Sequence, residues 1–247
     1  MSAVRAFTLA ALFEVHSLRL RIPLLDTISQ RRRTPVNLLL RYPAKPMQQA
    51  VARKARLPCM QCTVARASVV LRPPAGMDML WVCRLFEQPE FQERFALVED
   101  EAPGYRIRTA QRMGLCVVGM VHRRDDGARL GFVAMFAPAP ARNFWEMVAA
   151  IAQPRHRNGF HMLHAVDAMS HLMFDVMGAA RCGARVRADN AASLAVVRRL
   201  GHVCTAQEMT GGVLHQTYVL DAQAWQLRRE KLTRQGAGAA PFEVAPA

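Results

Sequence analysis

Hydrophobic positions in the second half of the chain follow the period of a helix between two segments with the period of strands. From residue 162 to 176 the apolar residues recur at spacings of three and four, which places them on one helical face: Met162, Ala165, Val166, Met169, Leu172, Met173 and Val176. Gly178 follows this run, as expected of a residue that ends a helix. The pattern therefore predicts one long amphipathic helix before Gly178.

Short apolar runs bounded by turn residues predict the remaining elements. Strands are expected near 68–72, 115–121, 130–136, 144–152, 182–188, 202–208 and 214–220. A helical region is expected at 77–98, divided in two by Pro89, and a second short helix should begin at Asp189 or Asn190 and stop at Gly201. Asp125-Asp126-Gly127 predicts a tight turn between two strands, because glycine tolerates positive φ.

This order of elements predicts an α/β fold of the mixed α+β kind. We expect a central mixed, partly parallel sheet with helices on both faces. The parallel part follows from the long helix, since two strands of one sheet that flank a helix are joined by a parallel crossover.

Charge divides the chain unevenly. The formal net charge is +14, but residues 1–66 hold twelve Lys or Arg and only Glu14 and Asp26 as acids. We therefore expect a basic, poorly ordered N-terminal extension at 1–66, a domain at 67–231 and a flexible tail at 232–247. A basic arm can make weak, salt-dependent contacts with nucleic acid. The alternative is a solvated tail, or translated sequence upstream of the true start.

Cysteine spacing and hydropathy bear on the cellular location of the protein. The six cysteines show no spacing typical of a disulfide framework, and no apolar run is long enough to span a bilayer. We expect reduced thiols, a cytoplasmic location and no membrane partner.

A basic turn precedes the long helix. It comprises Pro154, Arg155, His156, Arg157, Asn158 and Gly159. The first amides of a helix have no internal partners and, with the helix dipole, favour an anion such as a pyrophosphate, to which Arg155 and Arg157 add positive charge. Any basic turn before a helix has these properties. The pattern alone therefore leaves open whether this turn is an anion site or an ordinary basic turn.

Residues 173–201 resemble the second half of a GNAT-superfamily N-acetyltransferase domain. The resemblance is carried by Ala188-Asp189-Asn190-Ala191-Ala192-Ser193, followed by Leu200-Gly201, and by the hairpin segment Asp126–Phe132. It is closest to the subfamily that acetylates the N-termini of ribosomal proteins. The resemblance covers the domain at 67–231 and none of the extension.

The resemblance implies acetyl-CoA as co-substrate and a primary amine as acceptor, either a protein N-terminus or a small molecule. Acetyl-CoA would lie where two neighbouring parallel strands splay apart. Backbone groups would hold its pantetheine and polarise the thioester at Val148, Ala149, Ala150 and Ile151. Asn190 and Ser193 would lie beside the cofactor, and Arg157, Asn158, Gly159 and Phe160 would form the phosphate loop.

Glu146 is the candidate general base, because it lies on the strand beside the thioester site and an attacking amine must lose a proton. The alternative is a surface carboxylate at the start of a strand. The one-residue uncertainty in the strand leaves open which face Glu146 occupies.

Two positions depart from the family pattern. Phe160 stands where the phosphate loop has a glycine, unless a shift of one residue assigns Gly159 to that place, and a phenylalanine there would weaken cofactor binding. Val197 stands where many members have a tyrosine acid, so water would have to protonate the leaving thiolate.

Other readings of the chain stay open. In one alternative, the GNAT-like domain has lost its activity and the protein binds nucleic acid or the ribosome through its basic arm. The chain could also form a homodimer. His161, His164, His171 and Asp167 lie on the polar side of the long helix, where we expect a solvated face and no metal site.

Overall fold

The computed structural model describes residues 60–64, 68–94, 103–138, 143–157, 160–235 and 242–246. All described residues lie within one compact unit of the chain, which begins at residue 43. The expectations for residues 1–59 therefore fall outside the described residues. No helix in the described part is long and apolar enough to cross a membrane.

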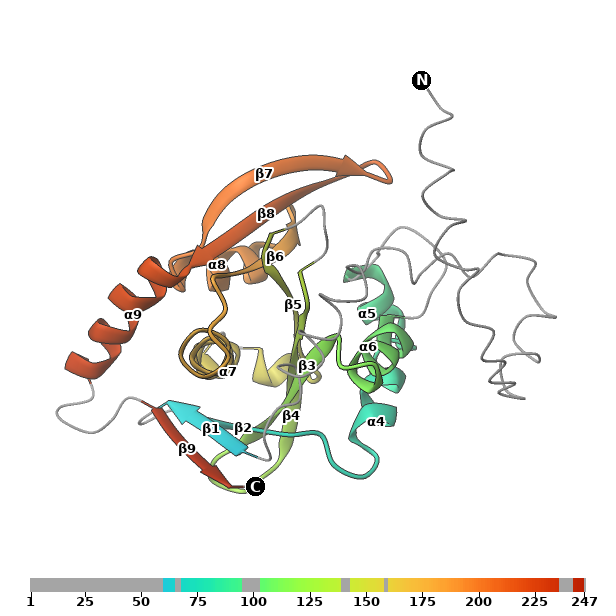
Figure 1. The fold of residues 1–247 in the computed structure, drawn as a ribbon. Coiled ribbons are helices and arrows are strands. Elements are labelled where there is room, and N and C mark those ends of the chain that lie inside the picture. Colours follow the sequence, from blue (N-terminus) through green and yellow to red (C-terminus); the bar gives the residue numbers. More distant parts are fainter. Residues whose placement is uncertain are drawn as a thin grey trace, which may run out of the picture. The chain divides into compact units, whose positions relative to one another are not determined.

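One mixed sheet forms the centre of the described fold, with the strand order β7-β8-β6-β5-β4-β3-β2-β1-β9 (Figure 1). Its strands are β1 Met60–Val64, β2 Val69–Arg72, β3 Cys116–Arg123, β4 Arg129–Phe136, β5 Trp145–Ile151, β6 Arg181–Arg187, β7 Val203–Thr210, β8 Val213–Asp221 and β9 Phe242–Pro246. The pairing of β5 with β6 is parallel, and the other recorded pairings are antiparallel. This confirms the mixed, partly parallel sheet.

Helices cover both faces of the sheet, as Figure 1 shows. The helices are α4 Asp78–Leu85, α5 Pro89–Arg94, α6 Pro103–Arg112, α7 Phe160–His171, α8 Ala191–Arg199 and α9 Ala222–Gln235. A π-helical turn, Leu172–Val176, continues α7. α7 is the crossover between β5 and β6, so α7 and α8 lie on one face, and α4 to α6 lie on the other.

Most of the expected elements are confirmed. Gly127 and Gly178 adopt positive φ where a turn and a helix end were predicted. The helix α6 was not predicted, because its buried apolar side chains amount to Ile107 and Ala110 in an otherwise polar segment. The strands β1 and β9 also lie outside the range 67–231. They are far apart in sequence but pair with one another in the sheet.

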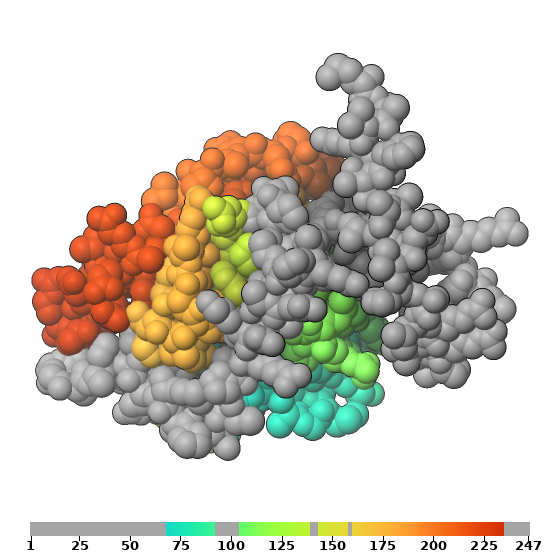
Figure 2. Space-filling view, viewed as in Figure 1, coloured from blue at the N-terminus to red at the C-terminus, as the bar shows by residue number. Residues whose placement is uncertain are grey.

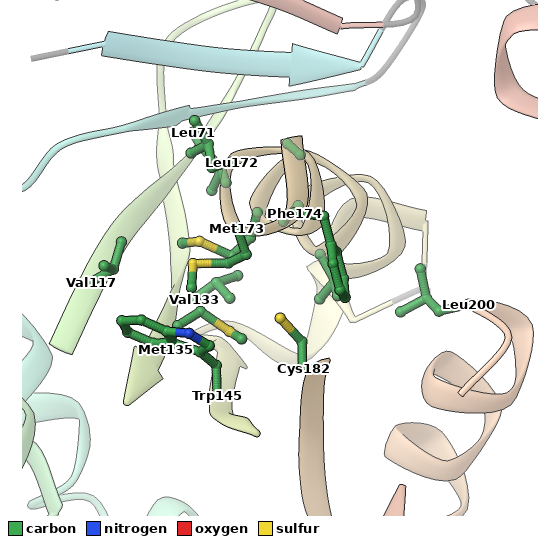
Figure 3. Close-up of a cluster of buried hydrophobic side chains, with 14 of the residues drawn as sticks. Leu71, Val117, Val133, Met135, Trp145, Leu172, Met173, Phe174, Cys182 and Leu200 are labelled. Carbon is green, nitrogen blue, oxygen red and sulfur yellow. The ribbon is translucent and has the colours of Figure 1, made fainter. Parts of the chain in front are cut away.

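A continuous apolar core fills the space between the sheet and α7. Alternate strand positions point to it, such as Val117, Val133 and Met135, and α7 with its π-helical turn contributes Met169 and Met173. Figure 3 shows these side chains converging with Trp145, Phe174 and Cys182. The predicted apolar face of the long helix is therefore buried from Ala165 to Met173, whereas Met162 is partly buried and Val176, in the π-helical turn, is exposed.

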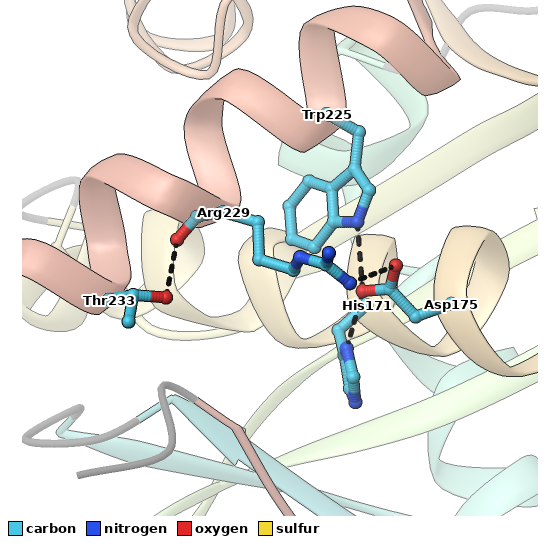
Figure 4. A network of polar contacts seen from close by, with 5 residues as sticks. All are labelled: His171, Asp175, Trp225, Arg229 and Thr233. Carbon is cyan, nitrogen blue, oxygen red and sulfur yellow. Dashed lines mark hydrogen bonds and ion pairs between the residues drawn. The ribbon is translucent and has the colours of Figure 1, made fainter. Parts of the chain in front are cut away.

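The helix α9 is fixed to the end of α7 through one carboxylate (Figure 4). Asp175 accepts hydrogen bonds from Trp225 Nε1 and Arg229 at 2.9 Å each and contacts His171 Nδ1 at 2.7 Å. The Trp225 ring stacks on Phe174 with 5.8 Å between centroids. These contacts join the crossover helix to the C-terminal helix.

The polar side of α7 is not the solvated face that the sequence suggested. Asp167 is only 1% exposed, and its carboxylate is bound by both the Nε and Nη2 groups of Arg228 on α9. The expectation was wrong at this position because it could not include α9, which packs over the polar side and brings its own cation.

Stability should decrease in mild acid because of His202, which is 6% exposed and whose Nδ1 has no hydrogen-bond partner among the described residues. Burial lowers the pKa of His202 from 6.5 to about 4. Between these values the unfolded chain binds more protons than the folded one, so this contribution is complete above pH 6.5 and decreases as the pH falls toward 4. We expect a loss of about 3 kcal/mol over that interval.

The measurement is urea unfolding at several pH values, for the wild type and for His202→Leu. The variant should lose less stability between pH 7 and 4.5, because it lacks the titrating ring. Equal losses in the two proteins would show that His202 is not the group responsible.

Candidate functional site

The site lies where β5 and β6 separate. These strands are paired at Trp145 with Cys182 and at Glu146 with Gly183, and no further pair is recorded between them. Beyond this point β5 continues to Ile151 along β4, while β6 continues to Arg187 along β8. One edge of β5 is thereby left without a strand partner, and a cavity of about 210 Å³ opens between the two strands.

Residues of the sheet, α7 and α8 line this cavity. The predicted strand residues Val148, Ala149, Ala150 and Ile151 lie along one wall, and Ala184 and Val186 of β6 lie along the other. The remaining walls include Met162 and Val166 of α7 and Val196 and Val197 of α8. The result is an elongated, largely apolar cleft with an exposed backbone edge, which suits a thin chain carrying amide groups.

The point of separation requires a residue without a side chain. A Cβ atom on Gly183 would lie 2.5 Å from the carbonyl oxygen of Tyr218 and 3.0 Å from the Phe144 ring. Glycine at this position thus allows β5, β6 and β8 to approach one another before β5 diverges.

Glu146 lies at this point and lines the cavity. Trp145 and Met147 pack toward the α7 face, so alternation places Glu146 on the face covered by α4 to α6. Its antiparallel partner Phe136 lies on the same face and contacts the guanidinium group of Arg106 on α6, 5.3 Å from the ring centroid. The structure therefore resolves the facing that the sequence left open.

Asn190 and Ser193 begin α8 and line the same cavity. The Asn190 side-chain oxygen accepts a hydrogen bond from the Ser193 backbone N–H at 3.1 Å, which confirms Asn190 as the N-cap. Because its oxygen accepts this bond, the NH₂ end of the amide is the part that can donate to a ligand of the cavity.

The basic turn contributes one of its arginines to the cavity. Arg157 lines it, but its guanidinium group also donates to the carbonyls of Ile151 (2.9 Å) and Ala152 (2.8 Å) and forms an ion pair with Glu90. Arg155 is exposed, donates to Gln153 and does not line the cavity. Asn158 and Gly159 lie outside the described residues.

Phe160 is the first residue of α7, and its side chain is 54% exposed. It does not line the cleft between β5 and β6. It lines a second cavity instead, and the Arg199 guanidinium carbon lies 5.9 Å from its ring centroid. The ring therefore does not fill the cleft, and the expectation that Phe160 weakens cofactor binding at the phosphate loop stays a prediction.

Sequence reasoning did not single out several residues that line the cleft. These include Arg185 and Arg187 of β6 and the buried His215 of β8, whose Nδ1 lies 3.1 Å from the carbonyl oxygen of Val213. Arg185 is paired with Glu208 and Arg187 with Asp189. The alternation of polar residues along 181–187 was the available signal, since Arg181, Arg185 and Arg187 all lie opposite the apolar face.

No group of three or more His, Cys, Asp or Glu side chains that could hold a metal ion occurs among the described residues. Among the polar residues of α7, His161 and His164 contact the Ser68 hydroxyl, at 2.7 and 3.2 Å. His171 is paired with Asp175 on its own helix.

Comparison with known proteins agrees with this architecture. Residues 68–203 match the family model described as an acetyltransferase (GNAT) domain. Among curated proteins, no sequence matches the chain. Because the family model covers more than half of the chain, the protein belongs to the GNAT acetyltransferase family and is an acyltransferase.

Solved structures with the same fold are similar over most of their length. RimJ from Mycobacterium smegmatis, in complex with CoA-disulfide, has a TM-score of 0.55 at 17% identity, covering 75% of this chain and 97% of its own. Spermidine N-acetyltransferase from Vibrio cholerae, with CoA and spermine, has a TM-score of 0.54 at 10% identity, covering 64% and 98%. The aminoglycoside acetyltransferase AAC(6')-Ib, with coenzyme A, has a TM-score of 0.54 at 11% identity, covering 66% and 99%.

Proposed function

We propose that the protein transfers the acetyl group of acetyl-CoA directly to a primary amine, in the cleft between β5 and β6. The observation that carries the proposal is the separation of these strands immediately after Glu146 and Gly183. It leaves the edge of β5 open to the amide groups of pantetheine and places a carboxylate at the closed end of the cleft.

In this proposal Glu146 accepts the proton of the attacking amine, directly or through water, and a backbone N–H of β5 donates to the oxyanion that forms at the thioester carbonyl. The C–N bond forms, the C–S bond breaks, and the thiolate leaves as free CoA. Val197 is buried in the cleft wall at the position where the family pattern has a tyrosine, so water supplies the proton to the thiolate.

For the acceptor we propose an uncharged protein or peptide N-terminus in place of a polycation. The face of the sheet that carries Glu146 also carries Arg185 at the cleft, and Arg106 lies over Phe136 on this face. Arg185 is paired with Glu208, so Arg106 is the guanidinium group that repels a polyamine more strongly than a single α-amine, which also loses its proton more easily. The solved spermidine and aminoglycoside acetyltransferases share the fold, which leaves the acceptor to be tested directly.

Calorimetry with the full chain tests the cofactor. We expect acetyl-CoA to bind with a dissociation constant of about micromolar order, equivalent to about −8 kcal/mol. Ser193→Phe should weaken binding at least about tenfold, because the ring would occupy the cleft, while Ala195→Phe, on the exposed side of α8, should leave it unchanged. Absence of binding at millimolar acetyl-CoA would contradict the proposal.

A panel of acceptors then tests the amine. Initial rates are measured for a neutral peptide with a free N-terminus, for spermine and for an aminoglycoside, at equal concentration. The peptide should be acetylated fastest. Faster turnover of either polycation would overturn the choice of acceptor and leave the acetyl transfer itself in place.

A further inference from the structure

The guanidinium group of Arg157 joins the end of β5 to the short helix α5. Its Nε donates to the carbonyl of Ile151 at 2.9 Å, and Nη2 donates to the carbonyl of Ala152 at 2.8 Å. Nη1 forms an ion pair with Glu90, the second residue of α5. A guanidinium group has five N–H donors in a rigid, planar arrangement, so these three partners fix its orientation.

The helix α5 brings an aromatic ring to the acetyl-CoA cleft. Phe91 is buried and lines the cavity between β5 and β6. Its ring meets Phe86 of α4 edge-on, with 6.2 Å between centroids, and the Phe86 ring lies 5.8 Å from that of Phe132 on β4. Phe132 lies four residues before Phe136, the strand partner of Glu146, so alternation places all three on one face of the sheet. Phe91 therefore reaches the cleft from the face that carries Glu146.

The position of α5 depends on contacts with the rest of the fold, because a helix of six residues is too short to be stable by itself. The rings of Phe86 and Phe91 hold it against α4. Arg157 holds it against β5 through Glu90, and its guanidinium carbon lies 5.4 Å from the centroid of the Phe91 ring. Figure 2 shows the green surface of α6 and the amber surface of α7 apart from one another, in keeping with their places on opposite faces of the sheet.

These contacts also bear on the phosphate role that the sequence suggested for Arg157. The carboxylate of Glu90 neutralises the charge that would attract a phosphate, and the two carbonyls at the end of β5 set the direction of the group. To bind a phosphate in this charge state, Arg157 would have to release Glu90 and with it α5. The two roles therefore predict opposite effects for the loss of the Glu90 charge.

We propose that Arg157 is a positioning residue: it fixes α5, with Phe91, against the end of β5 and thereby sets the affinity for the acceptor. The inference rests on the proposed function, because it takes the amine to approach Glu146 from the face that α4 to α6 cover. Arg157 acts on the acceptor through Glu90 and Phe91 and need not touch it. The same contacts link the acceptor wall to the strand that holds the cofactor.

The test combines initial rates, measured with the fastest acceptor of the panel, and calorimetry with acetyl-CoA, both on the full chain. Glu90→Gln should raise the KM for the acceptor about threefold to fivefold, the effect expected for a partly exposed ion pair. The side chain of Glu90 is 42% exposed, so the variant should fold as the wild type does. Its kcat and its affinity for acetyl-CoA should stay within about twofold. Glu87→Gln, in the exposed turn before α5, is the matched control and should change neither.

A double-variant cycle tests whether Glu90 acts through Arg157. Arg157→Gln should raise the KM for the acceptor at least as much as Glu90→Gln does, and adding Glu90→Gln to it should have little further effect. Arg157→Lys keeps the charge but lacks the planar group of donors, so it should resemble Arg157→Gln in this KM. Recovery of the KM by lysine, or additive effects in the double variant, would show that the three-way contact is not what positions α5.

The outcomes for acetyl-CoA separate this inference from the proposed function. If Glu90→Gln strengthens the binding of acetyl-CoA and leaves the KM for the acceptor unchanged, Arg157 is a phosphate ligand that Glu90 restrains, and the inference is wrong. An unchanged KM with unchanged acetyl-CoA binding would overturn it as well, as would a loss of acetyl-CoA affinity alone. In each of these cases the acetyl transfer itself stands, whereas absence of transfer by the wild type would overturn both proposals.

Discussion

Replacing Glu146 by glutamine should lower kcat at neutral pH by about a hundredfold or more, the usual range for loss of a general base. Glutamine keeps the size of the side chain but cannot accept the proton of the amine. Glu146 is paired with Gly183 at the closed, tightly packed end of the cleft. Since glutamine needs no more room than glutamate, the variant should keep this strand pairing. The affinity for acetyl-CoA should therefore stay within about twofold of the wild type.

The pH profile separates a base from a residue that only shapes the site. A base is needed only while the amine is protonated, so the deficit of Glu146→Gln should shrink as the pH approaches the pKa of the acceptor amine. Glu146→Asp, which retains a carboxylate, should lose less activity, and Asp125→Asn, in the exposed turn after β3, should lose none. A kcat for Glu146→Gln within about twofold of the wild type would identify Glu146 as a surface carboxylate.

Replacing Asp167 by alanine should lower the free energy of unfolding by about 3 to 5 kcal/mol. Asp167 is 1% exposed and accepts from two nitrogens of Arg228, so its removal leaves a guanidinium group in a largely buried place without its counter-charge. Burial raises the pKa of Asp167, and the Arg228 charge opposes that rise. Urea unfolding at pH 7 measures the loss.

A double variant distinguishes the loss of the Asp167–Arg228 ion pair from the loss of packing. Replacing both partners by apolar residues, Asp167→Leu with Arg228→Met, should recover most of the stability, because no buried charge is then left alone. Asp125→Ala, in the exposed turn, should change stability by less than about 0.5 kcal/mol. If Asp167→Ala and the double variant are equally unstable, packing against α9 and not the ion pair accounts for the loss.

Much of the fold could be predicted from local patterns. The hairpin of β3 and β4, the crossover β5–α7–β6 and the cap of α8 at Asn190 depend on residues close together in sequence, and periodicity with glycine conformation was enough to place them. The helix α6 gave too weak a pattern, since its buried face is formed mainly by Ile107 and Ala110. The pairing of β1 with β9 could not be predicted, because strand partners distant in sequence leave no local signal.

The cleft could also be predicted only in part. The strand residues Val148 to Ile151, with Asn190 and Ser193, do line one cavity with Glu146, as the resemblance implied. The roles of Arg155 and Arg157 were harder to predict, because a side chain in a turn chooses among several nearby acceptors. Arg157 is directed to the end of β5 and to Glu90, and Arg155 lies outside the cavity.

The sequence by itself determined the family, the order of elements from β2 to β8 apart from α6, and most of the face of α7 that is buried, because these follow from periodicity and from a short motif around Asn190. The tertiary structure alone decided which face Glu146 occupies, that Asp167 is buried, and that Phe160 lies beside a second cavity. Each of these depends on an element far away in sequence: α6 behind Phe136, or α9 over the polar side of α7. Burial and charge pairing across such distances arise from packing, to which no local pattern of residues is a guide.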